Sequence, residues 1–316
     1  MSRAGAVIIT WNSADVICEC LDAALAQGLD VVVVDNASTD GTLDEVRKRP
    51  RARWIANTTN RGFAAAVNQG VQELDVAFVL LLNPDAVLLE GVETLVAAVS
   101  EPGVGAAGGR LVDSGGRPQA GFMVRRFPTA LALSFEVLGV NRLWPGNPLN
   151  RHYRCFDLDP ESRCEVEQPA GAFVMIRREA WEAVGGFDEQ FCPLWFEDVD
   201  FLKRLKDRGW RVMYEPAAAA RHAGGHSAAK IARESRAVYW YGSLLRYVSK
   251  HFGAVGRGMV GASVLVGSVL RMASEVIGKR SLDPIPVHGR VVRLAWRRFL
   301  SGRAGEGSGS PVLARR

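Results

Sequence analysis

The feature that most limits the fold is an alternation of short apolar runs with helix-like segments. Apolar runs occupy residues 5–10 (GAVIIT), 30–35 (DVVVVD) and 76–82 (VAFVLLL), and a shorter run, RWIAN, begins at residue 53. Runs this apolar and rich in β-branched residues are typical of strands buried on both faces of a parallel sheet. Because helix-like segments separate them, the sequence predicts an α/β fold with a doubly wound, mostly parallel sheet.

The pattern divides the chain into three parts. An α/β domain is predicted over 1–227, a helical basic extension over 228–302, and a disordered tail rich in Gly and Ser over 303–316. Strands and helices alternate over about 1–110. Gly, Pro and Arg interleave between about 111 and 168, where we expect long loops and short strands laid over the sheet edge.

The formal net charge of +5 conceals a division between the two ends of the chain. Residues 1–227 hold 23 Lys and Arg against 30 Asp and Glu, whereas residues 228–316 hold 16 against 4. Aromatic and apolar residues interleave with the basic ones in the extension, which favours an anionic membrane surface over nucleic acid as its partner. The alternative is a helical subdomain packed on the first domain or on a second copy in a homo-oligomer.

No membrane-spanning helix is predicted. The longest uncharged run, GMVGASVLVGSVL at 258–270, has 13 residues, fewer than the roughly 20 that cross a bilayer. The N-terminal run is too short and too β-branched for a signal peptide. The five cysteines are few and scattered, which is typical of reduced cytosolic thiols. We therefore expect a cytoplasmic protein, peripheral on the inner face of the cell membrane.

Polar residues follow three of the predicted strands. These are Thr10-Trp11-Asn12, Asp35-Asn36 and Asn83-Pro84-Asp85. The carboxyl ends of strands in an open α/β sheet meet at one edge, which is where ligands bind. No GxGxxG follows the first strand, and GxxxxGK[ST] is absent from the sequence. The simplest remaining way to bind phosphates is therefore a divalent cation, Mg²⁺ or Mn²⁺, held by Asp85.

Seven motifs follow one another along the chain: TWN, VVVVDNASTDGT, NRGFAAAVNQG, LLLNPDAVLL, GAFVMIRREAWEAVGGFDE, WFEDVDFLKRLKDRGWRVMYEPAA and HAGGHS. The ordered set resembles the inverting family-2 glycosyltransferases with the GT-A fold. It is most similar to the bacterial branch that includes rhamnosyltransferases of cell-surface polysaccharide assembly. The resemblance covers about residues 5–227. It implies a catalytic domain with a nucleotide-sugar half over about 1–110 and an acceptor half over about 111–227.

The resemblance implies a set of donor-binding residues. Thr10 and Asp35 would line the base pocket, with Asp35 accepting a hydrogen bond from the pyrimidine N3–H. Asn36 stands where many relatives carry a second Asp. The predicted nucleotide-sugar site comprises Thr10, Asn12, Asp35, Asn36, Asn60, Gly62, Phe63, Asn68, Asn83 and Asp85. A helix start with small-residue packing is the alternative explanation for the stretch from Asn60 to Asn68.

The resemblance also implies a metal site. Asn83-Pro84-Asp85 stands in for the Asp-x-Asp motif of the family, which leaves Asp85 as the principal ligand. His222, in an H-x-x-G-x-S pattern with Gly225 and Ser227, resembles the second metal ligand of the family. His226 has no comparably clear role.

Three acids, Glu197, Asp198 and Asp200, begin a predicted helix. Inverting transfer is a single displacement that needs one base for the acceptor hydroxyl. The resemblance assigns this role to Asp198, with Glu197 beside it holding acceptor or donor hydroxyls. Asp200 lies four residues before Arg204, a spacing that favours a structural ion pair on one helix face.

Acceptor contacts are predicted for Trp195, Phe196 and Arg177. The two aromatic rings could offer a platform to a sugar or could fill core. Arg177 could approach an acceptor phosphate, since Arg binds phosphate in a bidentate manner, or it could be a solvated residue at a helix start.

The resemblance implies transfer of a sugar from a nucleotide diphosphate donor to a glycan or a polyprenyl-diphosphate-linked acceptor. L-rhamnose from dTDP-rhamnose is the first candidate, and UDP-sugars suit the predicted pocket equally well. One rival function is a sugar-nucleotide pyrophosphorylase, which would need a Gly-rich basic loop after the first strand. The other is a catalytically silent, membrane-docked scaffold, against which the acids and His222 argue.

Overall fold

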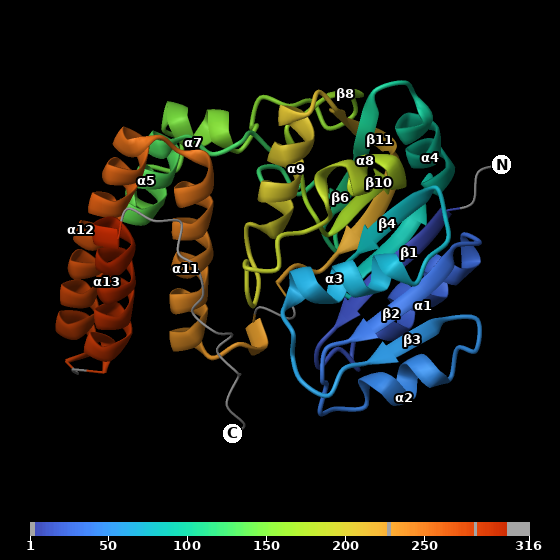
Figure 1. The fold of residues 1–316 in the computed structure, drawn as a ribbon, viewed down its shortest axis with the longest axis horizontal. Helices are drawn as coiled ribbons and strands as arrows, with labels where there is room; N and C mark the ends of the chain where they lie inside the picture. Colours follow the sequence, from blue (N-terminus) through green and yellow to red (C-terminus); the bar gives the residue numbers. More distant parts are fainter. Residues whose placement is uncertain (1–3, 226–228, 281–282, 302–316) are drawn as a thin grey trace. The chain divides into compact units, whose positions relative to one another are not determined.

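The computed structural model describes residues 4–225, 229–280 and 283–301 (Figure 1). The predicted disordered tail, together with His226 and Ser227, lies outside these residues. The chain forms two compact units. The first comprises the described residues of Met1–Phe127, Arg154–Pro193 and Glu197–Lys230, and the second those of Pro128–Tyr153, Leu194–Phe196 and Ile231–Arg316.

A mixed sheet of nine strands forms the centre of the first unit, in the order β3-β2-β1-β4-β10-β6-β11-β5, with β8 paired to β11. Two further strands, β7 and β9, pair with each other. The strand bounds are β1 Ala4–Thr10, β2 Asp30–Asp35, β3 Arg53–Ala56, β4 Phe78–Leu82, β5 Ala86–Glu90, β6 Val104–Val112, β7 Val124–Arg125, β8 Cys164–Glu165, β9 Gln168–Pro169, β10 Phe173–Arg177 and β11 Arg211–His222.

The first four strands, β3, β2, β1 and β4, run parallel to one another, whereas β10 is antiparallel to both β4 and β6. Thr10 pairs with Asp35, and Ile8 pairs with Leu82, the last residue of β4. The carboxyl ends of β1, β2 and β4 therefore meet at one edge, which we call the C-edge. The predicted α/β class with a largely parallel first half is confirmed.

Helices cover both faces of this sheet. Successive valines of β2 point to opposite faces, so both faces must be covered. Val31 and Val33 pack in one apolar cluster with α1 (Ile17–Ala26) and α4 (Val92–Ser100). Val32 and Val34 pack in the other with α3 (Phe63–Gln72), α8 (Arg178–Val184) and α9 (Glu197–Asp207). A short helix, α2, spans Thr42–Arg47. Both faces are apolar because both are buried.

The second unit is helical. It contains α5 (Ala130–Leu138), α6 (Val140–Leu143), α7 (Pro148–Tyr153), α11 (Arg233–His251), α12 (Ala254–Lys279) and α13 (Pro284–Ser301). Residues 233–251, 254–279 and 284–301 of the predicted basic extension are helical. However, residues 128–153 were expected to be loops and short strands of the first domain. They instead form helices that belong to the second unit, because the apolar α5 packs against α12.

Two expectations for the extension need correction. The aromatic residues of the extension were expected to favour contact with a membrane, but two of them, Tyr241 and Tyr247, are buried at 3% and 1% exposure. The uncharged run 258–270 was judged too short to span a bilayer, but the helix extends beyond it on both sides. Within the described residues one segment, Ala254–Gly278, is long and apolar enough to cross a membrane by length and composition alone.

Candidate active site

The C-edge begins with a buried pair between the first two strands. The Thr10 hydroxyl donates to Asp35 Oδ1 at 2.9 Å, and both residues are almost fully buried. The backbone N–H of Ser38 donates to Asp35 Oδ2 at 2.9 Å, which orients the carboxylate. A carboxylate held at the end of an apolar strand suits recognition of an N–H donor on a ligand. The structure thus brings Thr10 and Asp35 together as predicted.

Asn36 organises the next part of the C-edge. Its amide donates to Asn60 Oδ1 at 3.0 Å and to Gly62 O at 3.1 Å, and its carbonyl oxygen accepts from the N–H of Arg61 at 3.0 Å. Asn60 Oδ1 also accepts from the Gly62 N–H at 2.9 Å. The structure gives Asn36 and Asn60 the role of shaping this loop, because the Asn36 amide group and Asn60 Oδ1 bond to protein atoms.

Gly62 allows a close approach, but the neighbour is the chain itself. Its φ is +86°, and a Cβ there would lie 3.1 Å from Cys192 Sγ and 3.2 Å from Pro193 O. The next N–H, of Phe63, donates to that same Pro193 oxygen at 2.7 Å. The start of α3 is therefore fixed to the segment just before the acids of α9.

Asn12 lies in the loop after β1, with a φ of +52°. Its side-chain oxygen accepts from the Thr39 N–H at 2.8 Å, and its own N–H donates to Ser38 Oγ at the same distance. The ammonium of Lys230 donates to the Asn12 carbonyl and pairs with Asp15 at 3.2 Å. Asn12 therefore joins the loops after β1 and β2 to the segment that follows β11.

Asn83 and Asp85 follow β4 at the same edge. The Asn83 N–H donates to Ala172 O at 3.0 Å, just before β10 begins, and the Cys20 thiol contacts Asn83 O at 3.4 Å. Asp85 is 7% exposed, and its carbonyl accepts from the Ala223 N–H at 3.1 Å. Asp85 thus lies beside the end of β11, where His222 stands.

His222 faces Asp85 with its Nε2 atom, and Gln119 forms hydrogen bonds with its backbone carbonyl and its Nδ1 atom. The Gln119 amide nitrogen donates to His222 O at 2.8 Å, so its oxygen is the atom that meets His222 Nδ1 at 3.1 Å. An oxygen acceptor at Nδ1 places the ring proton there and leaves a lone pair on Nε2. Phe122 stacks on the ring, with centroids 5.2 Å apart.

The Asp85–His222 pair fits a divalent cation. His222 Nε2 lies 3.5 Å from Asp85 Oδ1, is buried, and has no hydrogen-bond partner. Two electron-rich atoms that face each other in a buried site repel unless a cation lies between them. Among the described residues no cluster of three or more His, Cys, Asp or Glu could hold a metal. Two ligands suit an ion that shares its coordination with substrate phosphates, as Mg²⁺ does.

Asp198 reaches the same edge from the start of α9. Its Oδ1 accepts from the Val199 N–H at 2.8 Å and its Oδ2 from the Gly171 N–H at 3.3 Å. Ala172, the next residue after Gly171, accepts the hydrogen bond from Asn83. Two consecutive residues before β10 therefore connect the Asp198 carboxylate to the Asn83–Asp85 turn.

The two adjacent acids differ in their surroundings. Burial raises the pKa of Glu197 well above its ordinary value, and repulsion from Asp198 raises it further. Glu197 Oε2 is buried without a hydrogen-bond partner. Burial also raises the pKa of Asp198, but the N–H groups of Val199 and Gly171 and the charge of Arg125 oppose the rise. Asp198 is therefore the acid better suited to be ionised and to accept a proton.

Asp200 has the structural role predicted for it. It is fully buried, and Arg204 Nε donates to its Oδ2 at 2.8 Å. The same guanidinium donates to the carbonyls of Val184 at 2.6 Å and Gly186 at 2.8 Å. Asp200 and Arg204 thus tie α9 to the end of α8.

Three predicted contacts are corrected by the structure. Arg177 pairs with Phe78 at the start of β4, at the edge opposite the C-edge, and donates to Val99 O and Glu101 O. The Asn68 amide is engaged by Phe187 and Glu189, so it ties α3 to the following loop.

The third correction concerns Phe196, which is 9% exposed and packs in the second unit with its ring centroid 5.5 Å from Tyr247. It fills core there and offers no open face to a sugar. Trp195 is half-buried, and an acceptor contact for it stays a prediction.

Four site residues were not predicted from the sequence: Gln119, Phe122, Arg125 and Gly171. Gln119, Phe122 and Arg125 lie in the Gly-, Pro- and Arg-rich stretch that carries no strand or helix periodicity. The only available signal was the gathering of aromatic and basic residues in that stretch.

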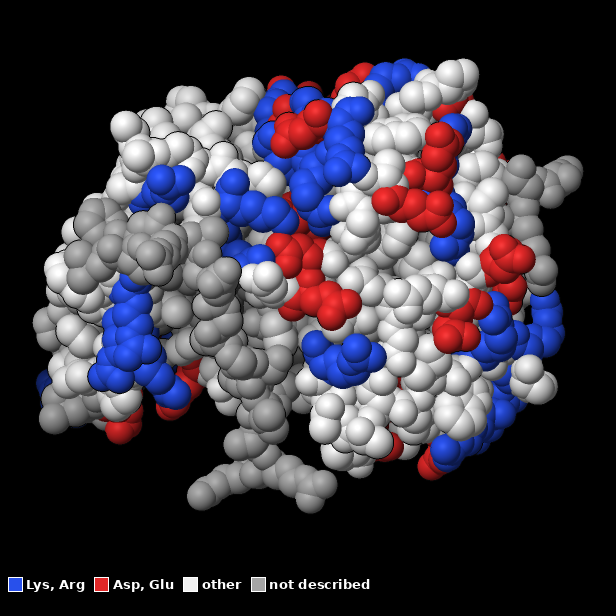
Figure 2. Space-filling model, in the orientation of Figure 1, with Lys and Arg blue, Asp and Glu red and all other residues white. Residues whose placement is uncertain are grey.

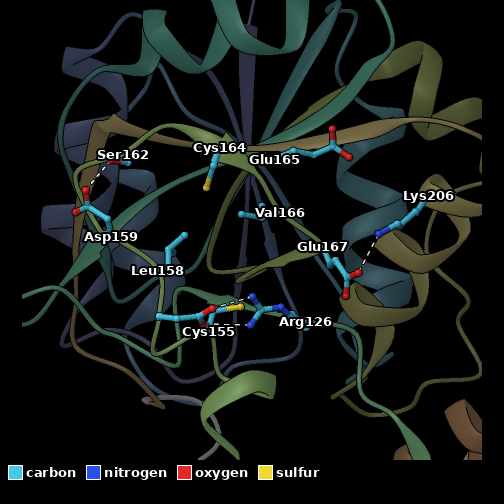
Figure 3. Close-up of a pocket in the computed structure, with 11 residues that line it drawn as sticks. Arg126, Cys155, Leu158, Asp159, Ser162, Cys164, Glu165, Val166, Glu167 and Lys206 are labelled. Atoms are coloured by element: carbon cyan, nitrogen blue, oxygen red, sulfur yellow. Dashed lines mark hydrogen bonds and ion pairs between the residues drawn. The ribbon is translucent and has the colours of Figure 1, made fainter. Parts of the chain in front are cut away.

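A pocket of about 510 Å³ lies elsewhere in the first unit (Figure 3). Its basic groups are both paired, Arg126 with Asp157 at 3.0 Å and Lys206 with Glu167 at 2.9 Å. Burial raises the pKa of its Cys155 thiol to about 11, so the thiol is protonated near neutral pH. None of the predicted site residues lines this pocket.

Comparisons with known proteins agree with this geometry. The model of glycosyl transferase family 2 matches residues 6–185, and a model described as the N-terminal domain of galactosyltransferase matches residues 151–223. An N-acetylglucosaminyl-diphospho-decaprenol L-rhamnosyltransferase from Mycobacterium tuberculosis is 30% identical over 249 residues, which cover 74% of this chain and 79% of that relative.

Solved structures with the same fold include GalNAc-T7 with UDP, GalNAc and Mn²⁺, at a TM-score of 0.57 and 14% identity over 78% of this chain and 48% of that one. The mannosyltransferase PcManGT from Pyrobaculum calidifontis, with GDP-Man and Mn²⁺, has a TM-score of 0.51 and 19% identity over 95% and 87%. S. aureus TarS 1–349 with UDP-GlcNAc has a TM-score of 0.52 and 17% identity over 96% and 89%.

The predicted GT-A fold and the predicted family are both confirmed by these comparisons. The family-2 model alone covers more than half of the chain. The chain therefore belongs to glycosyl transferase family 2, and it is a glycosyltransferase.

Proposed function

We propose that this enzyme transfers L-rhamnose from dTDP-rhamnose, with inversion, to a polyprenyl-diphosphate-linked glycan in cell-surface polysaccharide synthesis. The observation that carries the proposal is the convergence of Thr10–Asp35, Asp85–His222 and Asp198 at one sheet edge, with Gly171 and Ala172 joining the last two sets. The choice of sugar and acceptor rests on the name of the mycobacterial relative. A UDP-sugar or GDP-sugar is the second candidate donor, since structural neighbours hold these.

The base step follows from the surroundings of Asp198. An acceptor hydroxyl loses its proton to the carboxylate as its oxygen bonds to the anomeric carbon and the bond to the diphosphate breaks. Two N–H groups orient the carboxylate, and burial raises its proton affinity. A positioned base of this kind contributes about 10²- to 10⁴-fold to a rate. Burial raises the pKa of Glu197, which favours its protonated form, and in that form Glu197 can donate a hydrogen bond to a sugar hydroxyl.

A divalent cation, Mg²⁺ or Mn²⁺, would be held by Asp85 and His222. When bound, it would supply charge neutralisation for the diphosphate leaving group. Gln119 fixes the His222 tautomer that leaves Nε2 free to ligate. Asp35 and Thr10 would hold the base of the donor, with the loop around Asn36 and Asn60 beneath the ribose.

The experiment is a transfer assay with purified enzyme, a short-chain GlcNAc-diphospholipid acceptor, and a panel of dTDP-, UDP- and GDP-sugars. We expect product from dTDP-rhamnose, with the anomeric configuration inverted in NMR spectra, and loss of product on chelation of divalent cations. Product from a UDP-sugar alone would overturn the rhamnosyl assignment. Full activity in excess chelator would overturn the metal assignment.

A further inference from the structure

Helix α12 has an apolar face that no other described part of its unit covers. Five of its side chains follow helical spacing along one line: Val255, Met259, Val266, Leu270 and Ile277. They are 83%, 41%, 52%, 57% and 77% exposed. Together with the exposed Ala262, Val269 and Ala273 they form what we call the α12 stripe. The stripe spans 23 residues, and the 22 steps from Val255 to Ile277 cover about 33 Å of helix at 1.5 Å per residue.

The stripe contains no charged side chain. Of the exposed residues of α12 whose side chains are described, only Arg257 is charged. A rotation of 100° per residue places Arg257 on the opposite side of the helix from Val266. Monomeric soluble proteins rarely expose a continuous apolar surface of this length, which marks a contact site.

The opposite face of α12 packs against other helices of its own unit. Val260 and Val264 are fully buried. Arg271 donates to Val137 O at 3.1 Å and to the Tyr241 hydroxyl. Glu275 lies 3.6 Å from His288 Nε2. A helix that crossed a bilayer would carry these polar groups to its centre, whereas a helix lying in the interface keeps them within the protein.

We propose that the α12 stripe docks on an anionic lipid surface, with the helix lying in the plane of the interface. The positive charge of this part of the chain favours an anionic lipid surface as the partner of the stripe. The residues 228–302 hold 13 Lys and Arg against 3 Asp and Glu. On α13, Arg293 and Arg297 are exposed on either side of Trp296, which is 52% exposed. Lys and Arg side chains gather over α13 on the face shown in Figure 2.

A second copy of this chain would bring two such basic surfaces together, which costs energy through repulsion. Phospholipid headgroups of negative charge attract the same surface, at about 1 kcal/mol per Lys or Arg close to it. Docking at a membrane would bring the enzyme to a lipid-linked acceptor. The biological role of the stripe therefore rests on the proposed function.

The test is flotation of the full-length protein with vesicles of phosphatidylcholine, alone or mixed with phosphatidylglycerol, without donor or acceptor. The double variant Val266→Glu, Leu270→Glu should lose at least about tenfold in partitioning. The matched control Leu89→Glu, at a site 50% exposed on β5 of the first unit, should bind as wild type does. Arg293→Gln with Arg297→Gln should weaken binding to the mixed vesicles about fivefold per charge and leave binding to the neutral vesicles unchanged.

Circular dichroism must show wild-type helix content for each variant. The uncharged pair Val266→Asn, Leu270→Asn repeats the test if the Glu pair does not fold. Equal binding by wild type and folded stripe variants would overturn the proposal. A second outcome would also overturn it: wild type fails to float with either kind of vesicle, and light scattering shows that wild type is a dimer whereas the stripe variants are monomers. Transfer of the sugar to a water-soluble acceptor analogue is measured separately. If wild type shows no such transfer, the proposed function is refuted, whereas the result on membrane docking still holds.

Discussion

Replacing Asp198 with Asn removes the proposed base with little change of shape. The amide oxygen of Asn can take over the 2.8 Å hydrogen bond from Val199. Its NH₂ group then faces the Gly171 N–H, so the 3.3 Å hydrogen bond is lost. A lost hydrogen bond costs about 1 kcal/mol. The variant also removes a partly buried carboxylate whose ionisation is disfavoured by desolvation, which offsets that cost. We therefore expect a change in the free energy of unfolding within about 1 kcal/mol.

Turnover should fall far more than stability does. Loss of a general base predicts a decrease in kcat of about 10²- to 10⁴-fold. Initial rates of transfer at saturating donor give kcat, and calorimetric titration with the nucleotide gives Kd, which should stay near the wild-type value. The matched control is Asp200→Asn, two residues along, which breaks the ion pair with Arg204. It should lower stability and leave turnover per folded molecule unchanged. An Asp198→Asn enzyme with wild-type turnover would refute the base assignment.

Three further predictions test other parts of the site. Gln119→Ala releases the His222 tautomer and should weaken Mn²⁺ binding about 10- to 100-fold, measured by electron paramagnetic resonance of free Mn²⁺; unchanged affinity would contradict the role of Gln119. The raised pKa of Glu197 favours its neutral form in the folded state, so its contribution to stability is complete below the unfolded pKa and is lost as pH rises through the folded pKa. Glu197→Gln should therefore gain melting temperature relative to wild type as pH rises above the ordinary Glu pKa of 4.5, and a pH-independent difference would count against this. Arg204→Met leaves Asp200 buried without its cation and should cost about 3–5 kcal/mol in urea unfolding; a loss below about 1 kcal/mol would show that the pair is dispensable.

The strands of the first half could be predicted because their local sequence decides their environment. A run such as DVVVVD in β2 must be buried on both faces, and parallel strands then bring Thr10, Asp35 and Asp85 to one edge. The start of α9 was equally visible, since Glu197 begins the helix in the structure. These conclusions need only short-range pattern and the geometry of a parallel sheet.

The parts that were missed depend on contacts distant in sequence. Arg177 was placed near the acceptor, but β10 is antiparallel to β4, and nothing local in GAFVMIR shows a strand's direction. The helix α5 lies among Gly- and Pro-rich segments, and it is stabilised by α12, more than 100 residues later. Gln119 acquires its role only when β11 brings His222 beside it, so no pattern around residue 119 could reveal it.

The most direct test of rhamnosyl transfer with Asp198 as base is mass spectrometry of the product formed from dTDP-rhamnose and a GlcNAc-diphospholipid by wild type and by Asp198→Asn. We expect wild type to add one deoxyhexose to the acceptor, and the variant to bind nucleotide but form no product on the same timescale. Hydrolysis of the donor without transfer by wild type, or equal transfer by both proteins, would contradict it.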